Sequence, residues 1–286
     1  ALLHCQNVSL LGVNRMLTDD RYRQWVVDQV DDPFVRSFWQ EEFAGYDARF
    51  RREAIAPIQN KLGQFFLSPA VRNILGQVRT KISFPFVMDN RRIFIANLAK
   101  GKIGADMANL LGSLLVTQFQ LAAMRRAYQP ESERVDFFLH IDEFQNFGTE
   151  AFTSILSEAR KYRLSLTLAH QYINQLSPTV RDAVFGNVGS LIAFQVGFDD
   201  AHVLGEVFAR EFEAKQFVDL NRFETFASVR MDGHQSVPFR ANSLPPISNE
   251  ESTAATILRL NRERFASDRI VVEAKLNRWL GNGLQA

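Results

Sequence analysis

The chain contains 286 residues, which is enough for one large domain or for a core with a sizeable insertion. Hydrophobic residues make up 46% and charged residues 23%, an ordinary composition for a soluble globular protein. The formal net charge of +1 argues neither for nor against nucleic acid, and the single Cys5 excludes an internal disulfide framework and suits a reducing cytoplasm. No apolar run reaches the roughly 18 residues of a membrane span, and no signal peptide is recognised.

Residues 1–90 are predicted to be helical and irregular, because apolar residues recur at helical spacing and no stretch is a convincing strand. Asp32 is expected to cap a helix that has Pro33 in its first turn, and Ser68-Pro69 is expected to start a second helix over 70–75. The helical pattern already present at Ala1 leads us to expect the C-terminal part of a longer protein.

A basic cluster lies within this helical segment. Its members are Arg49, Arg51, Arg52 and Lys61, followed by Arg72, Arg79 and Lys81. Such a cluster is suited to contact a DNA backbone, or it forms the solvated face of a helix. Acidic residues in the same segment nearly balance these charges, which favours the solvated face.

From Arg91 onward the pattern changes to alternating strands and helices. Strands are predicted over 93–98, 137–141, 164–168 and 190–196, and helices over 106–127, 150–161, 177–185 and 201–208. This alternation predicts an α/β fold with a mostly parallel, doubly wound sheet.

Beyond residue 220 the alternation loosens. Residues 223–230 and 237–241 could pair as a hairpin across Asp232-Gly233. Leu244-Pro245-Pro246 is expected to end the core, and a polar helical tail is predicted over 249–284.

The predicted strand over 137–141 ends in two adjacent carboxylates, Asp142 and Glu143. An apolar strand that delivers Asp-Glu at its C-terminal end fits the Walker B element of a nucleotide-hydrolysing α/β core. The first acid would hold Mg²⁺, directly or through water, and the second would orient or deprotonate the attacking water. A buried strand that runs into a solvated acidic turn is the simpler alternative.

The next predicted strand supplies a second polar signal, Gln171. Parallel strands deliver their C-terminal ends to the same crevice, so Gln171 is expected beside Glu143, where its amide can bond a γ-phosphate or the attacking water. His140 and His170 each adjoin a motif residue. Strand alternation turns them toward the other face, and we interpret both as packed histidines and not as metal ligands.

Several stretches carry a resemblance to a known family. They are Ile141-Asp142-Glu143-Phe144-Gln145-Asn146-Phe147, Leu156-Ser157-Glu158-Ala159-Arg160-Lys161, Ala169-His170-Gln171, Asn97-Leu98-Ala99-Lys100-Gly101, Arg181-Asp182-Ala183-Val184-Phe185-Gly186-Asn187-Val188-Gly189 and Leu244-Pro245-Pro246. In order and spacing they resemble the motor domain of type IV secretion coupling proteins. These are the conjugative DNA-transfer ATPases of the VirD/TraD/TraG kind, within the HerA–FtsK group of P-loop motors.

The resemblance implies a role for each matching residue. Asp142 becomes the Mg²⁺-associated acid, Glu143 the catalytic glutamate and Gln171 the sensor of the γ-phosphate of ATP. Arg160 aligns with the arginine that such motors insert into a neighbouring subunit's nucleotide site. The helix dipole offers a simpler reason for a cation there. Arg181 is a weaker candidate, since an exposed helical arginine explains it equally well.

The resemblance also implies an organisation and partners. Residues 1–90 would be the all-helical domain inserted between Walker A and Walker B, 91–246 the Walker B half of a RecA-like P-loop NTPase core, and 247–286 a C-terminal helical tail. Such motors translocate DNA as homo-oligomers, usually hexamers, and contact relaxosome or secretion-channel proteins. A cytoplasmic domain at the inner face of a bacterial cell membrane is implied, attached only through a segment absent from this chain.

One departure from the family concerns phosphate binding. A P-loop motor needs G-x-x-x-x-G-K-[ST], and no such stretch exists here. Gly101-Lys102 lacks the earlier glycine and is followed by Ile103. The loop is therefore expected upstream of Ala1, and the fragment alone is expected to be inactive as an ATPase.

Two alternatives remain open. The Asp-Glu pair also occurs in motif II of superfamily 2 helicases, but the next strand there normally carries a Ser-Ala-Thr-like element, where this chain has Leu168-Ala169-His170-Gln171. A non-hydrolytic RecA-like scaffold or adaptor that recruits DNA-transfer or secretion partners is the other alternative. It would show no P-loop upstream and no effect of changing Glu143.

Overall fold

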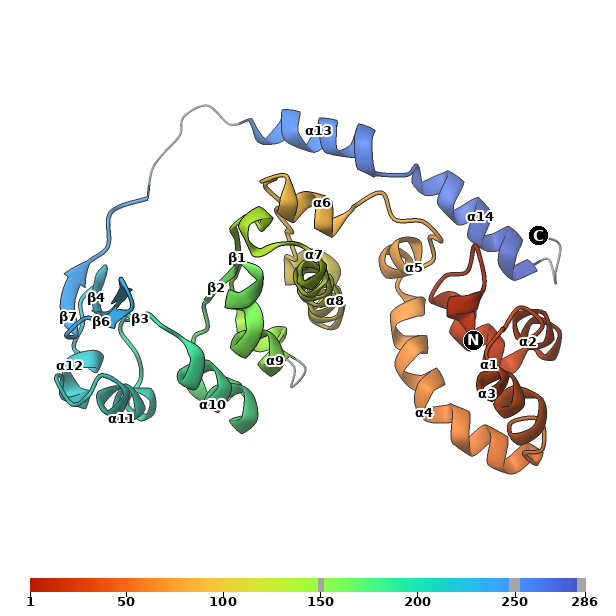
Figure 1. Ribbon diagram of the computed structural model, residues 1–286, viewed down its shortest axis with the longest axis horizontal. Coiled ribbons are helices and arrows are strands. Elements are labelled where there is room, and N and C mark those ends of the chain that lie inside the picture. The colour runs from red at the N-terminus through yellow and green to blue at the C-terminus, as the bar shows by residue number, and fades with distance from the viewer. Residues whose placement is uncertain (149–151, 247–252, 282–286) are drawn as a thin grey trace. The chain divides into compact units, whose positions relative to one another are not determined.

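The computed structural model describes residues 1–148, 152–246 and 253–281, and the chain divides into two structural units. The first unit comprises Ala1–Ile82 and Ser252–Ala286, and the second comprises Ser83–Glu251. In Figure 1 the first unit carries the helices α1 to α5 together with the blue α13 and α14, and the second carries every labelled strand.

The described part of the first unit is built from helices. They are η1 (Leu2–His4), α1 (Leu11–Thr18), α2 (Asp20–Val27), α3 (Pro33–Ser37), the π-helical turn η2 (Phe38–Glu42), α4 (Ala48–Leu67), α5 (Pro69–Leu75), α13 (Ala254–Phe265) and α14 (Arg269–Gly281). The predicted cap at Asp32 is confirmed, because its carboxylate accepts hydrogen bonds from the backbone N–H groups of Phe34 and Val35. The helical prediction for 1–90 therefore holds.

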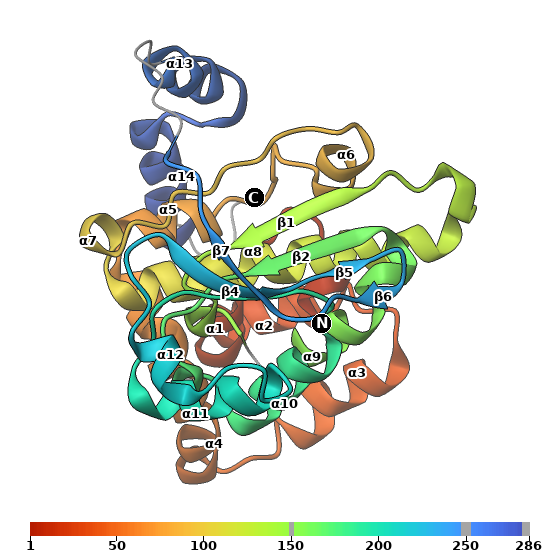
Figure 2. The same cartoon turned by 90° about the vertical axis from the view of Figure 1, so that its left-hand side faces the viewer.

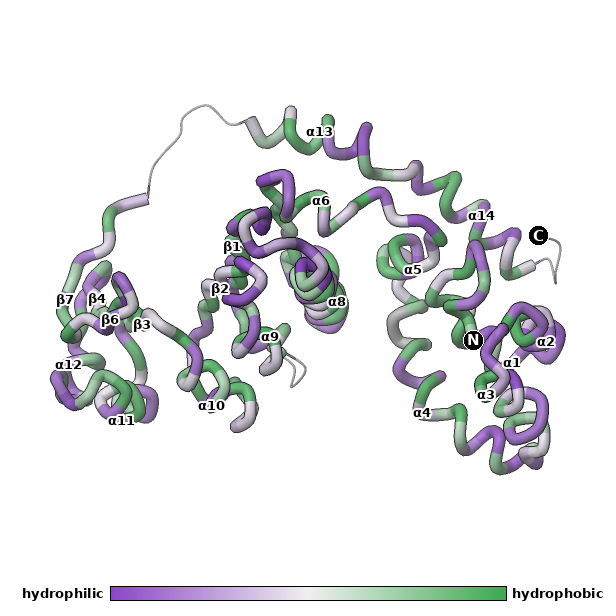
Figure 3. Tube along the Cα trace, viewed as in Figure 1, coloured by the Kyte–Doolittle hydropathy of each residue, from purple (hydrophilic) through white to green (hydrophobic). Residues whose placement is uncertain are grey.

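The last described helix, α14, packs within the first unit. Val272 and Leu276 are buried against Leu11 of α1, and Arg15 donates a hydrogen bond of 2.9 Å to the backbone oxygen of Trp279. Helix α13 is different, since none of its residues is buried. Figure 3 shows hydrophobic and hydrophilic residues alternating along it. The helical tail is thus confirmed over its described residues; 249–252 and 282–284 lie outside them.

The second unit places its strands in separate small sheets. Its helices are α6 (Phe84–Asp89), α7 (Lys100–Ile103), α8 (Ala105–Arg125), α9 (Phe152–Glu158), α10 (Pro178–Asn187), α11 (Phe198–Val207) and α12 (Ala214–Val218), with short 3-10 turns η3 (Arg126–Tyr128), η4 (Glu131–Glu133), η5 (Phe144–Asn146), η6 (Ala159–Tyr162) and η7 (Ile173–Gln175). Its strands are β1 (Phe137–Ile141), β2 (Leu164–Leu168), β3 (Leu191–Ala193), β4 (Glu224–Ser228), β5 (Arg230–Met231), β6 (His234–Gln235) and β7 (Phe239–Asn242).

Strands β1 and β2 form a parallel pair, with Phe137 opposite Leu164 and Ile141 opposite Leu168. Figure 2 shows the two arrows side by side and pointing the same way. Both strands and their parallel pairing match the prediction. Because the strands end together, their following residues meet at one edge of the sheet.

The remaining strands correct the predicted sheet. Strand β3 pairs antiparallel with β4, and β4 pairs antiparallel with β7, so these three form a second sheet. The hairpin predicted between 223–230 and 237–241 across Asp232-Gly233 is confirmed, because β4 pairs antiparallel with β7 and β5 pairs antiparallel with β6 on either side of that turn. The described fold is a mostly helical α/β arrangement with small sheets, and it shows no large parallel sheet.

The predicted strand over 93–98 is also wrong in this structure. Residues 92–99 have no helical or strand assignment. Phe94 packs inward, against Phe84 and Phe119, while Ile93 and Ile95 are 91% and 83% exposed. Strand-like alternation is present, but a strand also needs a hydrogen-bonded neighbour, and this segment has none among the described strands.

Helix α8 forms the back of the β1–β2 core. Its buried positions recur every three or four residues as Ala108, Gly112, Val116, Phe119 and Ala123, which is one face of a helix. Phe119 stacks on Phe137 of β1 with ring centroids 5.4 Å apart. Among the described helices, the stretch Ala105–Tyr128 is long and apolar enough to cross a membrane by length and composition alone. Its Val116, Phe119, Ala122 and Ala123 lie in the hydrophobic core of the second unit.

Gly112 provides a test of this packing. A methyl group at this position would lie 2.1 Å from Cε1 of Phe147, so Gly112→Ala must displace the ring. We expect a loss of about 1–3 kcal/mol in the free energy of unfolding, measured by urea denaturation. Gly186, in α10, has no atom within 4 Å of such a methyl group, and the control Gly186→Ala should stabilise by about 0.5–1 kcal/mol. Equal changes in the free energy of unfolding for Gly112→Ala and Gly186→Ala would contradict the close packing of Phe147 on Gly112.

Candidate functional site

The site forms where the paired strands end. The backbone N–H of Ala169 donates to the oxygen of Ile141 at 2.9 Å, and the N–H of Phe144 donates to the oxygen of Ala169 at 2.8 Å. These two bonds continue the strand pairing past its last residues. Phe144 is fully buried, and burial of such a ring contributes about 1.5–3 kcal/mol. The turn that carries Asp142 and Glu143 is therefore fixed on both sides.

Glu143 has an unusual backbone conformation. Its φ is 52° and its ψ is 42°, in the left-handed region that a non-glycine residue occupies at a cost of about 1–2 kcal/mol. The backbone N–H of Glu143 donates to Oδ1 of Asp142 at 2.9 Å, and Nδ2 of Asn146 donates to the backbone oxygen of Glu143 at 2.9 Å. Strained residues of this kind persist where the surrounding structure holds them.

Two amide side chains bind the Glu143 carboxylate. Nε2 of Gln145 donates to Oε2 at 2.7 Å, and Nε2 of Gln171 donates to Oε1. Gln171 comes from the end of β2 and Gln145 from η5, so both carboxylate oxygens have a fixed donor. The predicted proximity of Gln171 and Glu143 is confirmed. The arrangement holds a carboxylate that can accept a proton from a bound water.

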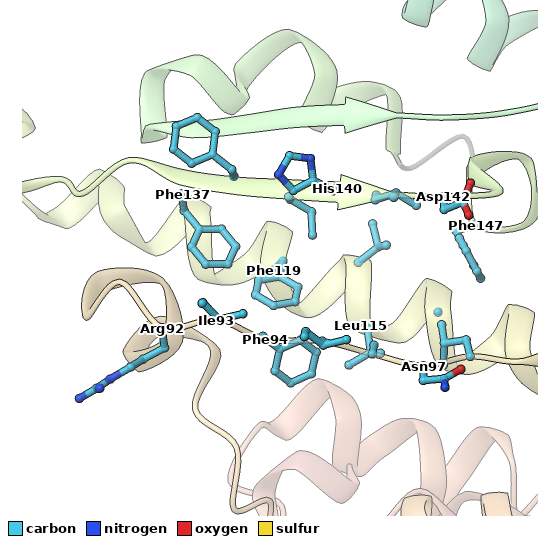
Figure 4. Close-up of a pocket in the computed structure, with 18 of the residues that line it drawn as sticks. Arg92, Ile93, Phe94, Asn97, Leu115, Phe119, Phe137, His140, Asp142 and Phe147 are labelled. Atoms are coloured by element: carbon cyan, nitrogen blue, oxygen red, sulfur yellow. The ribbon is translucent and has the colours of Figure 1, made fainter. Parts of the chain in front are cut away.

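Beside the acids runs a groove of about 1190 Å³. It is lined by residues 91–100, by 135–143, by α8 and by Phe147. In Figure 4, Asp142 and Asn97 lie at one end of the groove and Arg92 at the other, with Phe94, Leu115 and Phe119 between them. The site therefore has a polar end at the strand termini and an apolar body.

Three further polar residues surround Glu143 that the sequence analysis does not select as site residues: Gln145 and Asn146, which bond to Glu143, and Lys100, which bonds to Asn146. Nζ of Lys100 donates to Oδ1 of Asn146 at 2.9 Å. All three residues stand within stretches that carry the family resemblance, but the resemblance gives none of them a role in the site. The available signal for Gln145 and Asn146 is that they follow the Asp-Glu pair closely in sequence, so a turn at this point brings their side chains back to Glu143.

The two histidines differ from each other. His140 is exposed and lines the groove, so the prediction of a packed His140 is wrong. It shares one face of β1 with Phe138, which is 63% exposed, and neither is covered. His170 is half-buried, as predicted. Burial lowers the pKa of His170, and the Asp200 carboxylate and a backbone hydrogen bond involving Tyr172 oppose part of the shift.

The structure does not bring Arg160 to the acids. Arg160 lies in η6, before β2, and the oxygen of Arg163 accepts from the N–H of Phe137 at the start of β1. Arg160 therefore lies near the start of β1, whereas Asp142 follows its end. The five residues of β1 separate the two by about 17 Å, at about 3.3 Å per residue. Arg181, in α10, forms an ion pair of 3.1 Å with Asp182. Neither arginine lines the groove beside Asp142 and Glu143.

Asp142 is the residue suited to a metal ion. Within residues 1–148, 152–246 and 253–281, no three or more His, Cys, Asp or Glu side chains form a metal cluster. Mg²⁺ commonly uses only one or two carboxylates and takes its other ligands from water and phosphate. Asp142 is exposed, with Oδ1 engaged by the backbone, and fits that donor set.

Comparison with known proteins adds no assignment. No protein-family model matches the chain, and no curated protein matches it.

The strain at Glu143 can be separated from its charge by two substitutions. Gln at position 143 removes the charge and keeps a side chain that disfavours the left-handed region, whereas Asn removes the charge and tolerates that region. We therefore expect Glu143→Asn to be more stable than Glu143→Gln by about 0.5–1 kcal/mol in thermal unfolding. A Glu143→Gln protein as stable as the Asn variant would show that the turn carries no strain.

Proposed function

We propose that this chain is the Walker B half of a RecA-like P-loop NTPase core that hydrolyses ATP. The observation that carries the proposal is the meeting of Asp142 and Glu143, after β1, with Gln171, after the neighbouring parallel strand. Ligands of α/β folds bind at such strand ends. Under this proposal β1 and β2 are two neighbouring strands of the parallel sheet of such a core.

Each side chain takes a defined role in hydrolysis. Asp142 would hold Mg²⁺, directly or through water, and the ion would neutralise charge on the phosphates. Glu143 would accept the proton of the attacking water, and the amide of Gln171 would donate a hydrogen bond to the γ-phosphate or to that water. The direct bond from Gln171 to Glu143 keeps both groups in place until a water enters between them.

Arg160 completes the proposal across a subunit interface. It is exposed and lies at the far end of the strand pair, so it cannot serve the acids of its own chain. An arginine supplied by a neighbouring subunit would stabilise transition-state charge. We accordingly propose a homo-oligomer, with six subunits by analogy to the family that the motifs resemble.

The biological role is proposed by the same analogy. The resemblance to type IV secretion coupling proteins suggests ATP-driven DNA translocation in conjugative transfer or secretion. The partners would be DNA and relaxosome or secretion-channel proteins, at the cytoplasmic side of a bacterial membrane. A non-hydrolytic scaffold with the same core would recruit those partners without ATP turnover.

ATP hydrolysis by the complete protein tests the proposal. Wild type should show DNA-stimulated turnover, and Glu143→Gln should lower kcat by about 100-fold or more while ATP binding is retained, because the base is lost and the carboxamide keeps the shape. Asp182→Asn, which removes an exposed carboxylate outside the site, is the control and should leave kcat unchanged. Equal inactivity of wild type and Glu143→Gln, under conditions that support assembly, would favour the scaffold.

A further inference from the structure

Lys100 is connected to the Glu143 turn although the two lie far apart in sequence. It is the first residue of α7, directly after the extended segment 92–99. Its Nζ donates to Oδ1 of Asn146 at 2.9 Å. Asn146 in turn donates twice to the backbone oxygen of Glu143, from Nδ2 at 2.9 Å and from its own N–H at 3.0 Å. A continuous hydrogen-bonded chain therefore runs from the Lys100 ammonium to the Glu143 peptide.

The charge of Lys100 strengthens this chain. A hydrogen bond from an ammonium group is stronger than one between neutral groups, and it polarises the amide so that its N–H donates more strongly. The oxygen that receives both Asn146 bonds belongs to the residue with φ of 52°. Holding that oxygen fixes the peptide plane after Glu143, and with it the direction of the carboxylate.

We propose that Lys100 is a positioning residue that acts through Asn146 to hold Glu143 in its left-handed conformation. The consequence for catalysis rests on the function proposed above. Lys100 would then raise kcat, because a displacement of about 1 Å at the base lowers rates by up to about 100-fold. It would leave the KM for ATP unchanged, because it acts on the peptide of Glu143 and not on the nucleotide.

The same short helix provides a matched control. Lys102 lies two residues further along α7, is exposed like Lys100, and makes no side-chain hydrogen bond or ion pair in the part of the chain that the structure describes. Lys102→Met removes the same charge from the same helix. Lys100→Arg keeps a cationic donor and serves as the conservative variant.

Hydrogen–deuterium exchange on the complete protein tests the contact independently of catalysis. In Lys100→Met the N–H of Asn146, which bonds to Glu143, should exchange about five- to tenfold faster than in wild type. Lys100→Arg and Lys102→Met should exchange at the wild-type rate. Unchanged exchange in Lys100→Met would overturn the proposal, whether or not the protein hydrolyses ATP.

Steady-state kinetics test the consequence for turnover. Lys100→Met and Asn146→Ala should each lower kcat by about 10- to 100-fold with KM within about twofold, and the double variant should be no slower than either single variant. Lys100→Arg should recover most of kcat. A higher KM alone, additive losses, or a Lys100→Met enzyme equal to Lys102→Met would overturn the positioning role. An inactive wild type or a fully active Glu143→Gln would instead refute the proposed function.

Discussion

The parallel pairing of β1 with β2 is the constraint on which the candidate site depends. Because the two strands end in register, the backbone bonds through Ala169 bring the residue two positions later, Gln171, against Glu143. A slip of one residue would turn the apolar side chains of β1 out of the core formed with α8. The same packing that stabilises the unit therefore also sets the geometry of the acids.

The acidic turn combines strain with support. Glu143 occupies a disfavoured backbone region, and it is held there by Asp142, Asn146 and two glutamines, one on each carboxylate oxygen. A solvated acidic turn with no function would have no need for this set of fixed contacts. Positive φ angles also occur at other non-glycine residues such as Arg163, so it is the fixed contacts on both carboxylate oxygens that support the catalytic interpretation over the simpler one.

The sequence predicts those elements whose signal lies within the element itself, in the periodicity of its apolar residues or in its capping residue. The apolar runs of β1 and β2, the buried stripe of α8 and the Asp32 cap all lie within one element and its period. The Asp142–Glu143–Gln171 cluster followed because parallel strands end together. The sequence could not predict that 93–98 forms no strand or that β3 pairs antiparallel with β4. Alternation of apolar residues indicates a strand but does not indicate the strand with which it pairs.

The remaining features of the site depend on backbone angles and on contacts distant in sequence. The sequence around Glu143 does not indicate a left-handed backbone conformation at this position, because that conformation is usually adopted by Gly or Asn and not by Glu. The contact of Lys100 with Asn146 spans 46 positions and arises only once α7 and η5 both pack on α8. Strand alternation predicts that His140 lies packed on the other face of the sheet, but no element covers this face of β1 at His140, and the side chain is exposed.

The most direct measurement is a structure of the complete protein with Mg²⁺ and a non-hydrolysable ATP analogue. The account predicts the γ-phosphate at the ends of β1 and β2, with a water about 3 Å from the Glu143 carboxylate and Mg²⁺ held by Asp142 directly or through water. Nucleotide bound at another surface, with Glu143 and Gln171 still bonded to each other and distant from any phosphate, would contradict it.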